Sequence, residues 1–221
     1  MSYNIAIDGP AGAGKSTIAK KIAKELSYIY VDTGAMYRAM ALFFLRQGIR
    51  PEETDRISEE CNNANVTIEY QNGEQQVLLN GENVNGLIRT EEVGNMASAT
   101  SVNANVRTKM VQLQQQLAKT ADVIMDGRDI GTKVLPNATL KIYLTASSRT
   151  RATRRYNELV AKNVECDLDT IEKDIIERDD RDMHREHSPL MQAEDAILVD
   201  SSDMTIDEVV EKIITLFKER L

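Results

Sequence analysis

The sequence predicts an α/β protein in which a parallel five-stranded sheet carries helices on both faces. Short apolar segments alternate with helical patterns along the 221 residues, and strands that alternate with helices usually pair in parallel. Several of these segments end in an acid, among them Asp8, Asp32 and Asp126. Ligands of such sheets bind at the carboxyl ends of the strands. We expect the five strands at residues 3–8, 28–31, 121–126, 139–144 and 196–200.

A glycine-rich stretch follows the first strand and fits the pattern G-x-x-x-x-G-K-[S/T]. A helical pattern comes directly after it, and strand, glycine loop and helix together are typical of a phosphate-binding P-loop. Lys15 would reach the β- and γ-phosphates of a nucleotide, and the Ser16 hydroxyl would hold Mg²⁺. The sequence therefore predicts a P-loop NTPase fold rather than a turn without a ligand. The residues expected to contact ATP here are Gly9, Pro10, Ala11, Gly12, Ala13, Gly14, Lys15, Ser16 and Thr17.

Residues 63–85 differ in character from the rest of the chain. Residues 66–70 alternate between apolar and polar side chains, and Asn72-Gly73 is a strong hairpin signal. The two apolar segments around this turn are too short and too polar for the centre of a parallel sheet. We expect a small antiparallel β insert on the main body.

The remaining segments show helical periodicity. One of them, residues 54–63, is polar, and the glutamine run 114–116 is expected on the solvated face of its helix. Thr205 begins the last helix with a capping-box sequence. The helices that follow the P-loop helix are expected to begin at or near residues 33, 54, 90, 103, 147, 168 and 205.

Composition limits the classes of partner. The net charge is −8 and the pI about 5.0, so nothing draws the whole chain toward nucleic acid or anionic membranes. Cys61 and Cys166 stand far apart without a C-x-x-C pattern, which favours neither a zinc site nor a redox pair and is typical of a reducing compartment. No run is long enough to cross a bilayer, and no signal peptide is indicated. We expect a cytoplasmic monomer of one domain.

The P-loop leaves open which molecule accepts the phosphoryl group. The chain has no guanine-reading N-K-x-D segment, and the strand ending at Asp126 lacks the second acid of motor-type ATPases. A small chain with scattered arginines favours a small-molecule phosphotransferase. Two phosphorylated substrates that meet head-on bring roughly four or more negative charges together, and planar guanidinium groups suit them. The arginines available for this are Arg38, Arg128, Arg178 and Arg185, each of which also has an alternative as a surface ion pair.

Six segments in this order resemble the bacterial-type cytidylate kinases over essentially the whole chain. The D-T-G-A-M-Y-R, D-G-R-D-I-G-T and E-R-D-D-R-D segments carry most of the specificity. The segments are residues 7–17, 32–38, 79–84, 88–93, 126–132 and 177–182. The resemblance implies the reversible reaction of ATP with CMP or dCMP to give ADP with CDP or dCDP, and the P-loop serine implies Mg²⁺ with the ATP. It also implies a core with a mobile acceptor-binding insert and a short helical lid.

The resemblance divides the chain into core (1–62), insert (63–85), core with CMP-binding helices (86–148), lid helices (149–185) and core (186–221). It places Thr33 near the acceptor. It assigns the cytosine edge to Ser98, Arg107 and Asp129, the CMP phosphate to Arg38, Arg128 and Arg185, and the ribose to Arg178 and Asp182. Lys15, Arg128 and Arg185 are the expected catalytic residues. Among the arginines of residues 149–155, we favour Arg154 or Arg155 near the ATP phosphates. By pattern alone, Ser98 is an ordinary helix residue and Arg107 an exposed one.

A carboxylate at Asp129 would accept from the N4 amino group of cytosine and repel O4 of uracil. The alternatives are another small P-loop kinase, acting on UMP, AMP, shikimate or a nucleoside, and a nucleotide-binding switch without an acceptor. A nucleoside acceptor would need a general base, whereas the phosphate of a monophosphate is already an anion.

Overall fold

The computed structural model describes residues 2–71 and 73–221. Its main sheet has five strands in the order β2-β6-β1-β7-β8, and every neighbouring pair is parallel. The predicted strands are therefore confirmed, each within two residues at either end. The strands are β1 (Asn4–Asp8), β2 (Ile29–Asp32), β6 (Val123–Gly127), β7 (Leu140–Thr145) and β8 (Ile197–Asp200).

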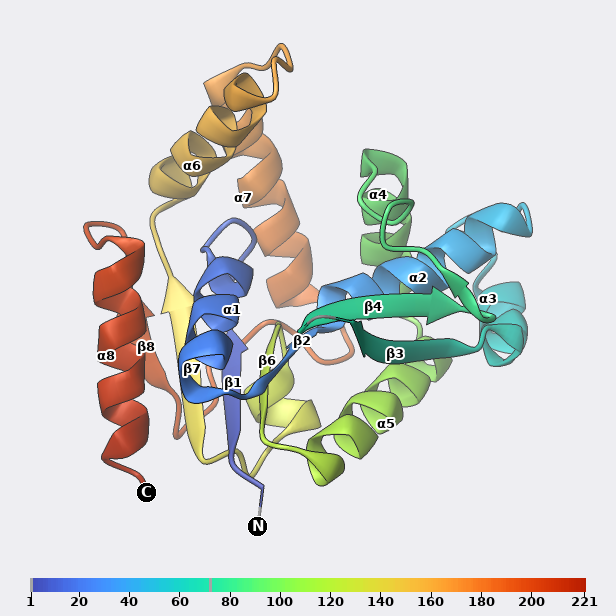
Figure 1. Ribbon diagram of the computed structural model, residues 1–221. Coiled ribbons are helices and arrows are strands. Elements are labelled where there is room, and N and C mark those ends of the chain that lie inside the picture. Colours follow the sequence, from blue (N-terminus) through green and yellow to red (C-terminus); the bar gives the residue numbers. More distant parts are fainter. Residues whose placement is uncertain (1, 72) are drawn as a thin grey trace.

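Helices cover both faces of this sheet (Figure 1). Side chains alternate between the faces of a strand, and in β1 Ala6 belongs to one hydrophobic cluster whereas Ile5 and Ile7 belong to the other. The Ala6 cluster includes residues of α2 (Thr33–Arg46) and α5 (Ala104–Thr120). The other cluster includes residues of α1 (Lys15–Leu26) and α8 (Ile206–Lys218). The sheet is thus buried on both sides, as its apolar strands predict.

The insert is a three-stranded antiparallel sheet of β3 (Val66–Gln71), β4 (Glu74–Leu79) and β5 (Glu82–Asn83). Asn72 of the predicted hairpin turn lies outside the described residues, and Gly73 has the positive φ of 79° that such a turn requires. Val77 and Leu79 are buried in the same cluster as α2. The insert therefore shares the core of the main body.

This insert also contacts the edge strand β2 through side chains. The Asp32 N–H donates to Gln75 Oε1 at 2.8 Å, and Gln75 Nε2 donates to the Asp32 carbonyl at 3.3 Å. The Tyr70 hydroxyl donates to the Tyr30 carbonyl at 3.1 Å. An exposed strand edge carries unpaired backbone groups, and the insert satisfies part of that edge.

The other helices lie around the rim of the sheet. The helix expected at residues 54–63 is α3 (Thr54–Glu60) followed by a 3₁₀ turn, Cys61–Asn63. Thr90 caps α4 (Glu91–Thr100) and Thr205 forms the predicted capping box of α8. Two helices, α6 (Ser148–Ala161) and α7 (Leu168–His184), pack together and extend beyond the carboxyl ends of the strands (Figure 1).

Two expectations about solvation are wrong. Gln114, expected on a solvated face of α5, is 1% exposed, and its Nε2 has no hydrogen-bond partner among the described residues. Arg107, an exposed residue by pattern, is 5% exposed. The helical period of a sequence shows on which face of the helix a side chain lies, but it does not show which other elements pack against that face. No helix in the described part of the chain is long and apolar enough to cross a membrane.

Candidate active site

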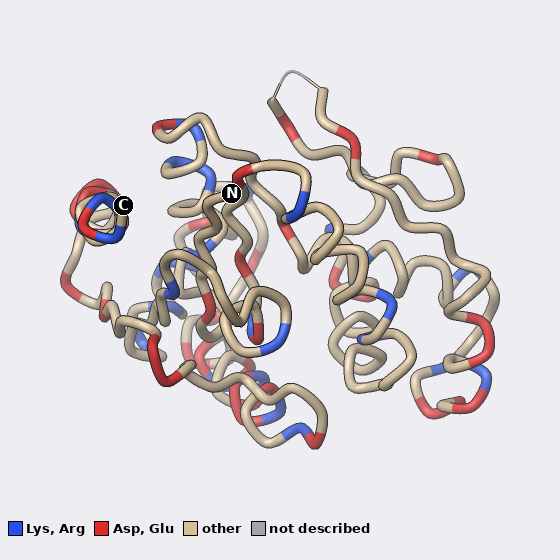
Figure 2. The backbone as a smooth tube through the Cα atoms, turned by 90° about the horizontal axis from the view of Figure 1, so that it is seen from below, with Lys and Arg blue, Asp and Glu red and all other residues tan. Residues whose placement is uncertain are grey.

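One cavity of about 540 Å³ opens where the carboxyl ends of the central strands meet the P-loop, α2, α4, α5 and α7. It brings together nearly all residues that the sequence singled out. The predicted site residues that line it are Ala11, Gly12, Ala13, Gly14, Lys15, Ser16, Thr17, Thr33, Arg38, Ser98, Arg107, Arg128, Asp129, Arg154, Arg178, Asp182 and Arg185. Gly9 and Pro10 are not among its lining residues. Basic and acidic residues are interspersed along the chain as a whole (Figure 2), so the cavity's positive charge is a local feature.

Close backbone contacts shape the P-loop. Gly9 has φ 151°, and a Cβ there would lie 1.9 Å from the Leu144 carbonyl oxygen, so only glycine fits. Lys15 Nζ donates to the Pro10 carbonyl at 2.6 Å. Burial, together with the positive charge of Arg128, lowers the pKa of Lys15 well below its usual value. A bound phosphate would place further negative charge beside this ammonium group.

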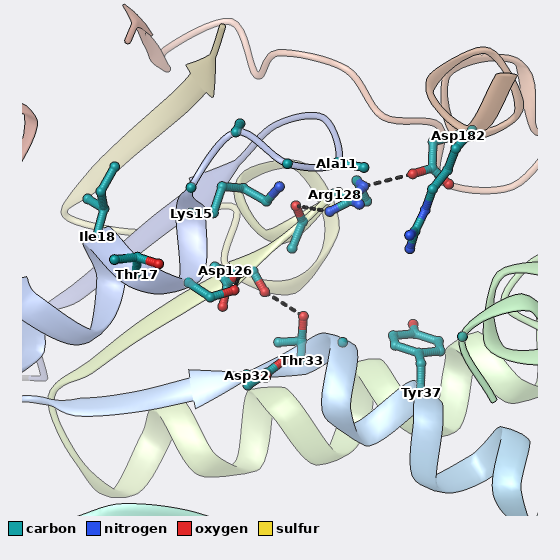
Figure 3. A pocket seen from close by; sticks show the side chains of 18 of the residues that line it. Ala11, Lys15, Thr17, Ile18, Asp32, Thr33, Tyr37, Asp126, Arg128 and Asp182 are labelled. Atoms are coloured by element: carbon teal, nitrogen blue, oxygen red, sulfur yellow. Dashed lines mark hydrogen bonds and ion pairs between the residues drawn. The ribbon is translucent and has the colours of Figure 1, made fainter. Parts of the chain in front are cut away.

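The carboxylate of Asp126, at the end of β6, is held from two sides beside the P-loop. Ser16 Oγ donates to Asp126 Oδ2 at 2.9 Å, and the Tyr30 hydroxyl donates to Oδ1 at 2.7 Å. Thr33 Oγ1 donates to the Asp126 carbonyl at 2.6 Å and so fixes the start of α2 against β6 (Figure 3). Tyr30 has no place in the predicted site. In the sequence, Tyr30 is one residue of the short apolar segment 28–31, and nothing in that pattern indicates a contact with Asp126.

The Ser16–Asp126 arrangement fits Mg²⁺. One hydroxyl and one carboxylate adjoin the phosphate loop, and Mg²⁺ in nucleotide sites prefers a few protein oxygens combined with phosphates and water. Among the described residues no group of three or more His, Cys, Asp or Glu side chains is placed to hold a metal alone. Any ion here would therefore depend on the nucleotide for most of its ligands.

A buried ion pair forms part of the wall of this cavity. Arg107 Nη2 on α5 donates to Oδ2 of Asp129, and Arg107 Nη1 donates to the Ser101 carbonyl at 3.1 Å. The guanidinium carbon lies 5.6 Å from the ring centre of Tyr37. The buried Nε of Arg107 and the Tyr37 hydroxyl have no hydrogen-bond partner among the described residues. Buried polar atoms are rarely left unpaired, so this wall has donors available for a polar ligand.

Tyr37 was not singled out from the sequence, although it lies in the D-T-G-A-M-Y-R segment. Burial, partly offset by the Arg107 charge, raises the pKa of Tyr37 to about 12. Arg89 and Asp32 were missed as cavity residues too. Arg89 Nη2 donates to Asp32 Oδ2 at 2.7 Å, and Asp32 Oδ1 caps α2 by accepting from the Ala35 N–H. Tyr37, Arg89 and Asp32 thus line the cavity near the start of α2.

The four arginines expected to gather near Lys15 line the same cavity, and the alternative of scattered surface ion pairs is wrong for them. Arg128 Nε donates to Asp182 Oδ2 at 2.8 Å (Figure 3), and Arg185 Nη1 lies 3.9 Å from Asp182 Oδ1. Burial, with the nearby charge of Arg128, lowers the pKa of Arg178 to about 10. One buried nitrogen of Arg178 and one of Arg185 have no partner among the described residues. The cluster is thus under-neutralised and suited to anions.

The structure adds two details to the placement of the arginines. Arg178 and Arg185 are seven residues apart, a spacing that would put both on one face of a single helix, but α7 ends at His184 and Arg185 follows it in extended backbone. Arg185 Nε instead donates to the Ser188 carbonyl at 2.6 Å. In α6, Arg154 donates to the Ser201 carbonyl at 2.6 Å, whereas Arg155 is exposed and pairs with Glu158. A contact of Arg154 with ATP phosphates stays a prediction.

The parallel sheet, the P-loop and a cavity that joins the loop to a cationic cluster define a P-loop phosphotransferase. The comparisons with known proteins agree. The family model described as cytidylate kinase matches residues 5–219. A cytidylate kinase of Caldicellulosiruptor bescii is 51% identical over 214 residues, which cover 97% of this chain and 95% of that protein. One from a Geobacillus strain is 48% identical over 220 residues, covering 100% and 98%. The chain belongs to the cytidylate kinase family.

Solved structures with far lower identity share the fold. A gluconokinase from Sinorhizobium meliloti gives a TM-score of 0.52 at 12% identity and covers 98% of this chain and 92% of its own. A shikimate kinase from Bacteroides thetaiotaomicron gives a TM-score of 0.51 at 13% identity and covers 98% of both chains. At this distance the likeness concerns the fold alone.

Proposed function

We propose that this protein transfers the γ-phosphoryl group of ATP to CMP and dCMP, giving ADP with CDP or dCDP, in a reversible reaction of pyrimidine nucleotide metabolism. The observation that carries the proposal is that one cavity joins Lys15 of the P-loop to the buried Arg107–Asp129 pair. The first end suits a nucleoside triphosphate, and the second suits the hydrogen-bonding edge of a base. Full-length identity near one half to cytidylate kinases supports the choice of base.

Phosphoryl transfer requires in-line positioning and charge neutralisation more than covalent help from the protein. In the proposed mechanism the P-loop N–H groups and Lys15 hold the β- and γ-phosphates of ATP. Arg38, Arg128 and Arg185 hold the phosphate of CMP so that its oxygen faces the γ-phosphorus. Arg128 and Arg185 then stabilise the charge that spreads over the transferring group. The attacking phosphate oxygen is already anionic, so the mechanism requires no general base.

Ser16, with Asp126 beside it, would hold Mg²⁺ in the ATP complex. The ion would neutralise phosphate charge and orient the triphosphate, as it does generally in phosphoryl transfer. The protein's own contribution is to keep the Ser16 hydroxyl and the Asp126 carboxylate facing the P-loop. Tyr30 and Thr33 supply that support from β2 and α2.

Specificity for cytosine is assigned to Asp129, with Arg107 and Ser98 as donors. The Arg107 contact uses Oδ2 of Asp129, which leaves Oδ1 for the N4 amino group of cytosine. Uracil would present O4 to that oxygen, and two acceptors repel each other. Arg107 or Ser98 would donate to N3 or O2. Arg178 and Asp182, which both line the cavity, are proposed to hold the ribose.

The helices of 149–185 are proposed to move as a lid over the core segments 1–62, 86–148 and 186–221. The insert (63–85) shares a hydrophobic cluster with α2, so we propose that it moves together with α2 as the acceptor-binding segment. Closure of such segments excludes water from the reacting phosphates. We also propose that the protein is a cytoplasmic monomer. The two free, widely spaced cysteines are typical of a reducing compartment and support the cytoplasmic location.

One coupled assay of ADP release, run with CMP, dCMP, UMP, AMP and GMP in turn, tests the function. The expected result is rapid release with CMP and dCMP and at least about 100-fold lower kcat/KM with the other three, since a base site of buried polar groups rejects a wrong edge strongly. Equal rates with UMP or AMP would reveal a kinase of another specificity. Release that does not depend on any acceptor would indicate a nucleotide-hydrolysing switch.

A further inference from the structure

One buried ion pair stands outside the residues assigned above. Arg151 on α6 places Nη1 2.6 Å from Oδ2 of Asp179 on α7, and the side chains are 7% and 8% exposed. The sequence showed Arg151 as one of several arginines on its helix and Asp179 as one acid in a charged run, with no role for either. An ion pair this deeply buried is costly unless further hydrogen bonds complete it.

Those further bonds go to the P-loop. The Ala11 N–H donates to Asp179 Oδ1 at 3.2 Å, and the Ala11 carbonyl accepts from Arg151 Nη1 at 2.8 Å. Arg151 Nε donates to the Ala146 carbonyl at 2.9 Å, which fixes the guanidinium at the end of β7. Both backbone polar groups of one P-loop residue are therefore held by the two helices.

Gly12, the next residue of the P-loop, allows α6 and α7 to pack closely against the loop. Gly12 has φ 75°, and a Cβ there would lie 3.3 Å from Arg151 Cβ and 3.8 Å from Ile175 Cδ1. The P-loop thus contacts α6 and α7 through its backbone at Ala11 and Gly12. On α7, Asp179 is flanked by Arg178 and followed by Asp182, which both line the cavity. One turn of this helix therefore touches the P-loop and the acceptor side of the cavity.

We propose that Arg151 and Asp179 are positioning residues that set the conformation of the P-loop for ATP and connect it to the helices proposed as the lid. Phosphate binding depends on the directions of the loop N–H groups, and those directions depend on the peptide planes next to Ala11. The proposal rests on the P-loop being an ATP site but not on cytosine as the acceptor base. A merely structural ion pair would support folding without affecting ATP affinity selectively.

The test is ATP binding to the full chain by calorimetry with MgATP and no acceptor. Asp179→Asn keeps the side-chain shape but removes the charge that faces Arg151. We expect its Kd for ATP to rise about tenfold, the scale of one charge-assisted hydrogen bond. In the transfer assay its KM for CMP should stay within about twofold of the wild-type value, because the substitution changes none of the side chains assigned to CMP.

Asp169→Asn is the matched control. Arg149 on α6 lies 2.6 Å from Asp169 on α7, so this variant breaks a second ion pair between the same two helices. That pair is exposed and has no contact with the P-loop among the described residues. Its loss should leave the Kd for ATP within about twofold of wild type, as expected for a surface pair.

Arg151→Lys keeps a positive charge but loses the planar guanidinium, whose Nη1 contacts Asp179 and Ala11 and whose Nε contacts Ala146. It should weaken ATP about tenfold as well, and the double variant Arg151→Lys/Asp179→Asn should lose far less than the product of the two single effects, about 100-fold. Asp179→Asn or Arg151→Lys with a lowered Tm and an unchanged Kd for ATP would overturn the proposal. An equal loss in Asp169→Asn would overturn it too. If the wild type binds ATP but transfers nothing to CMP, the proposed function fails while this test still stands.

Discussion

Arg107 on α5 and Asp129 after β6 form a buried ion pair in the wall of the cavity that the P-loop also lines. They lie 22 residues apart in the chain and are joined by a charge-assisted hydrogen bond. The pair uses one carboxylate oxygen and leaves Nε of Arg107 without a partner among the described residues. A base with both a donor and acceptors on its edge would complete this arrangement.

Asp129→Ala should therefore lower kcat/KM for CMP by about 100-fold, because a base-pairing group is lost and Arg107 keeps an unpaired buried charge. The ratio of kcat/KM for CMP to that for UMP should narrow, since the group that repels O4 is gone. Turnover with both nucleotides and the Tm are measured together. Asp180→Ala, an exposed acid on α7, is the control. An unchanged preference for CMP in Asp129→Ala would refute the assignment.

Tyr30 should orient Asp126 toward the nucleotide's metal. Tyr30→Phe removes the hydroxyl that donates to Asp126 Oδ1 at 2.7 Å and keeps the ring. Loss of a hydrogen bond behind a metal ligand commonly weakens metal binding by about tenfold or more. We expect the Mg²⁺ concentration for half-maximal activity to rise about tenfold, with kcat at saturating Mg²⁺ within about twofold.

Tyr28→Phe is the matched control, because it deletes the same atom two residues earlier. Tyr28 packs edge-to-face on Phe217 with ring centres 5.8 Å apart. Its Mg²⁺ dependence should match that of the wild type. Identical Mg²⁺ curves for Tyr30→Phe and Tyr28→Phe would show that the Tyr30 hydroxyl has no part in metal binding.

The insert should influence acceptor binding through Gln75. Gln75→Leu removes both hydrogen bonds to the backbone of Asp32, the residue that caps α2 and pairs with Arg89. Each such bond is worth roughly 1 kcal/mol, so we expect KM for CMP to rise about fivefold while KM for ATP stays the same. Gln76→Leu, whose native side chain accepts from Asn83 instead, is the control. Equal KM values for CMP in the two variants would contradict the prediction.

Asp8 should make stability depend on pH. Burial, only partly offset by hydrogen bonds from the Gly131 and Ile130 N–H groups, raises the pKa of Asp8 from 3.8 to about 6. The folded chain therefore keeps this proton at pH values where the unfolded chain has lost it. Its contribution to stability is complete below about pH 4 and is lost as pH rises through about 6, which amounts to about 3 kcal/mol.

Asp8→Asn removes this titration and keeps the size of the side chain. Urea unfolding at a series of pH values gives the free energy of unfolding of both proteins. The wild type should lose about 2 kcal/mol relative to the variant between pH 4 and pH 7. A difference between the two proteins that stays constant across this range would show that Asp8 keeps its ordinary pKa.

The sequence alone determined the sheet, its helical layers and the P-loop, because these follow from short-range rules. A period of two places Ala6 and Ile7 on opposite faces, and glycine spacing fixes the loop between β1 and α1. The four arginines that line the cavity were expected from charge balance, whereas Ser98 and Arg107 came from family resemblance and not from pattern. Tertiary structure alone decided which side chains meet. Gln114 and Arg107 are buried because of what packs against α5, and periodicity shows where a face points but not what lies opposite.

Likewise, the backbone of Ala11 is held by Arg151 and Asp179, 140 and 168 residues further along the chain. Contacts across that separation depend on how the sheet gathers its loops at one edge, which no local pattern records.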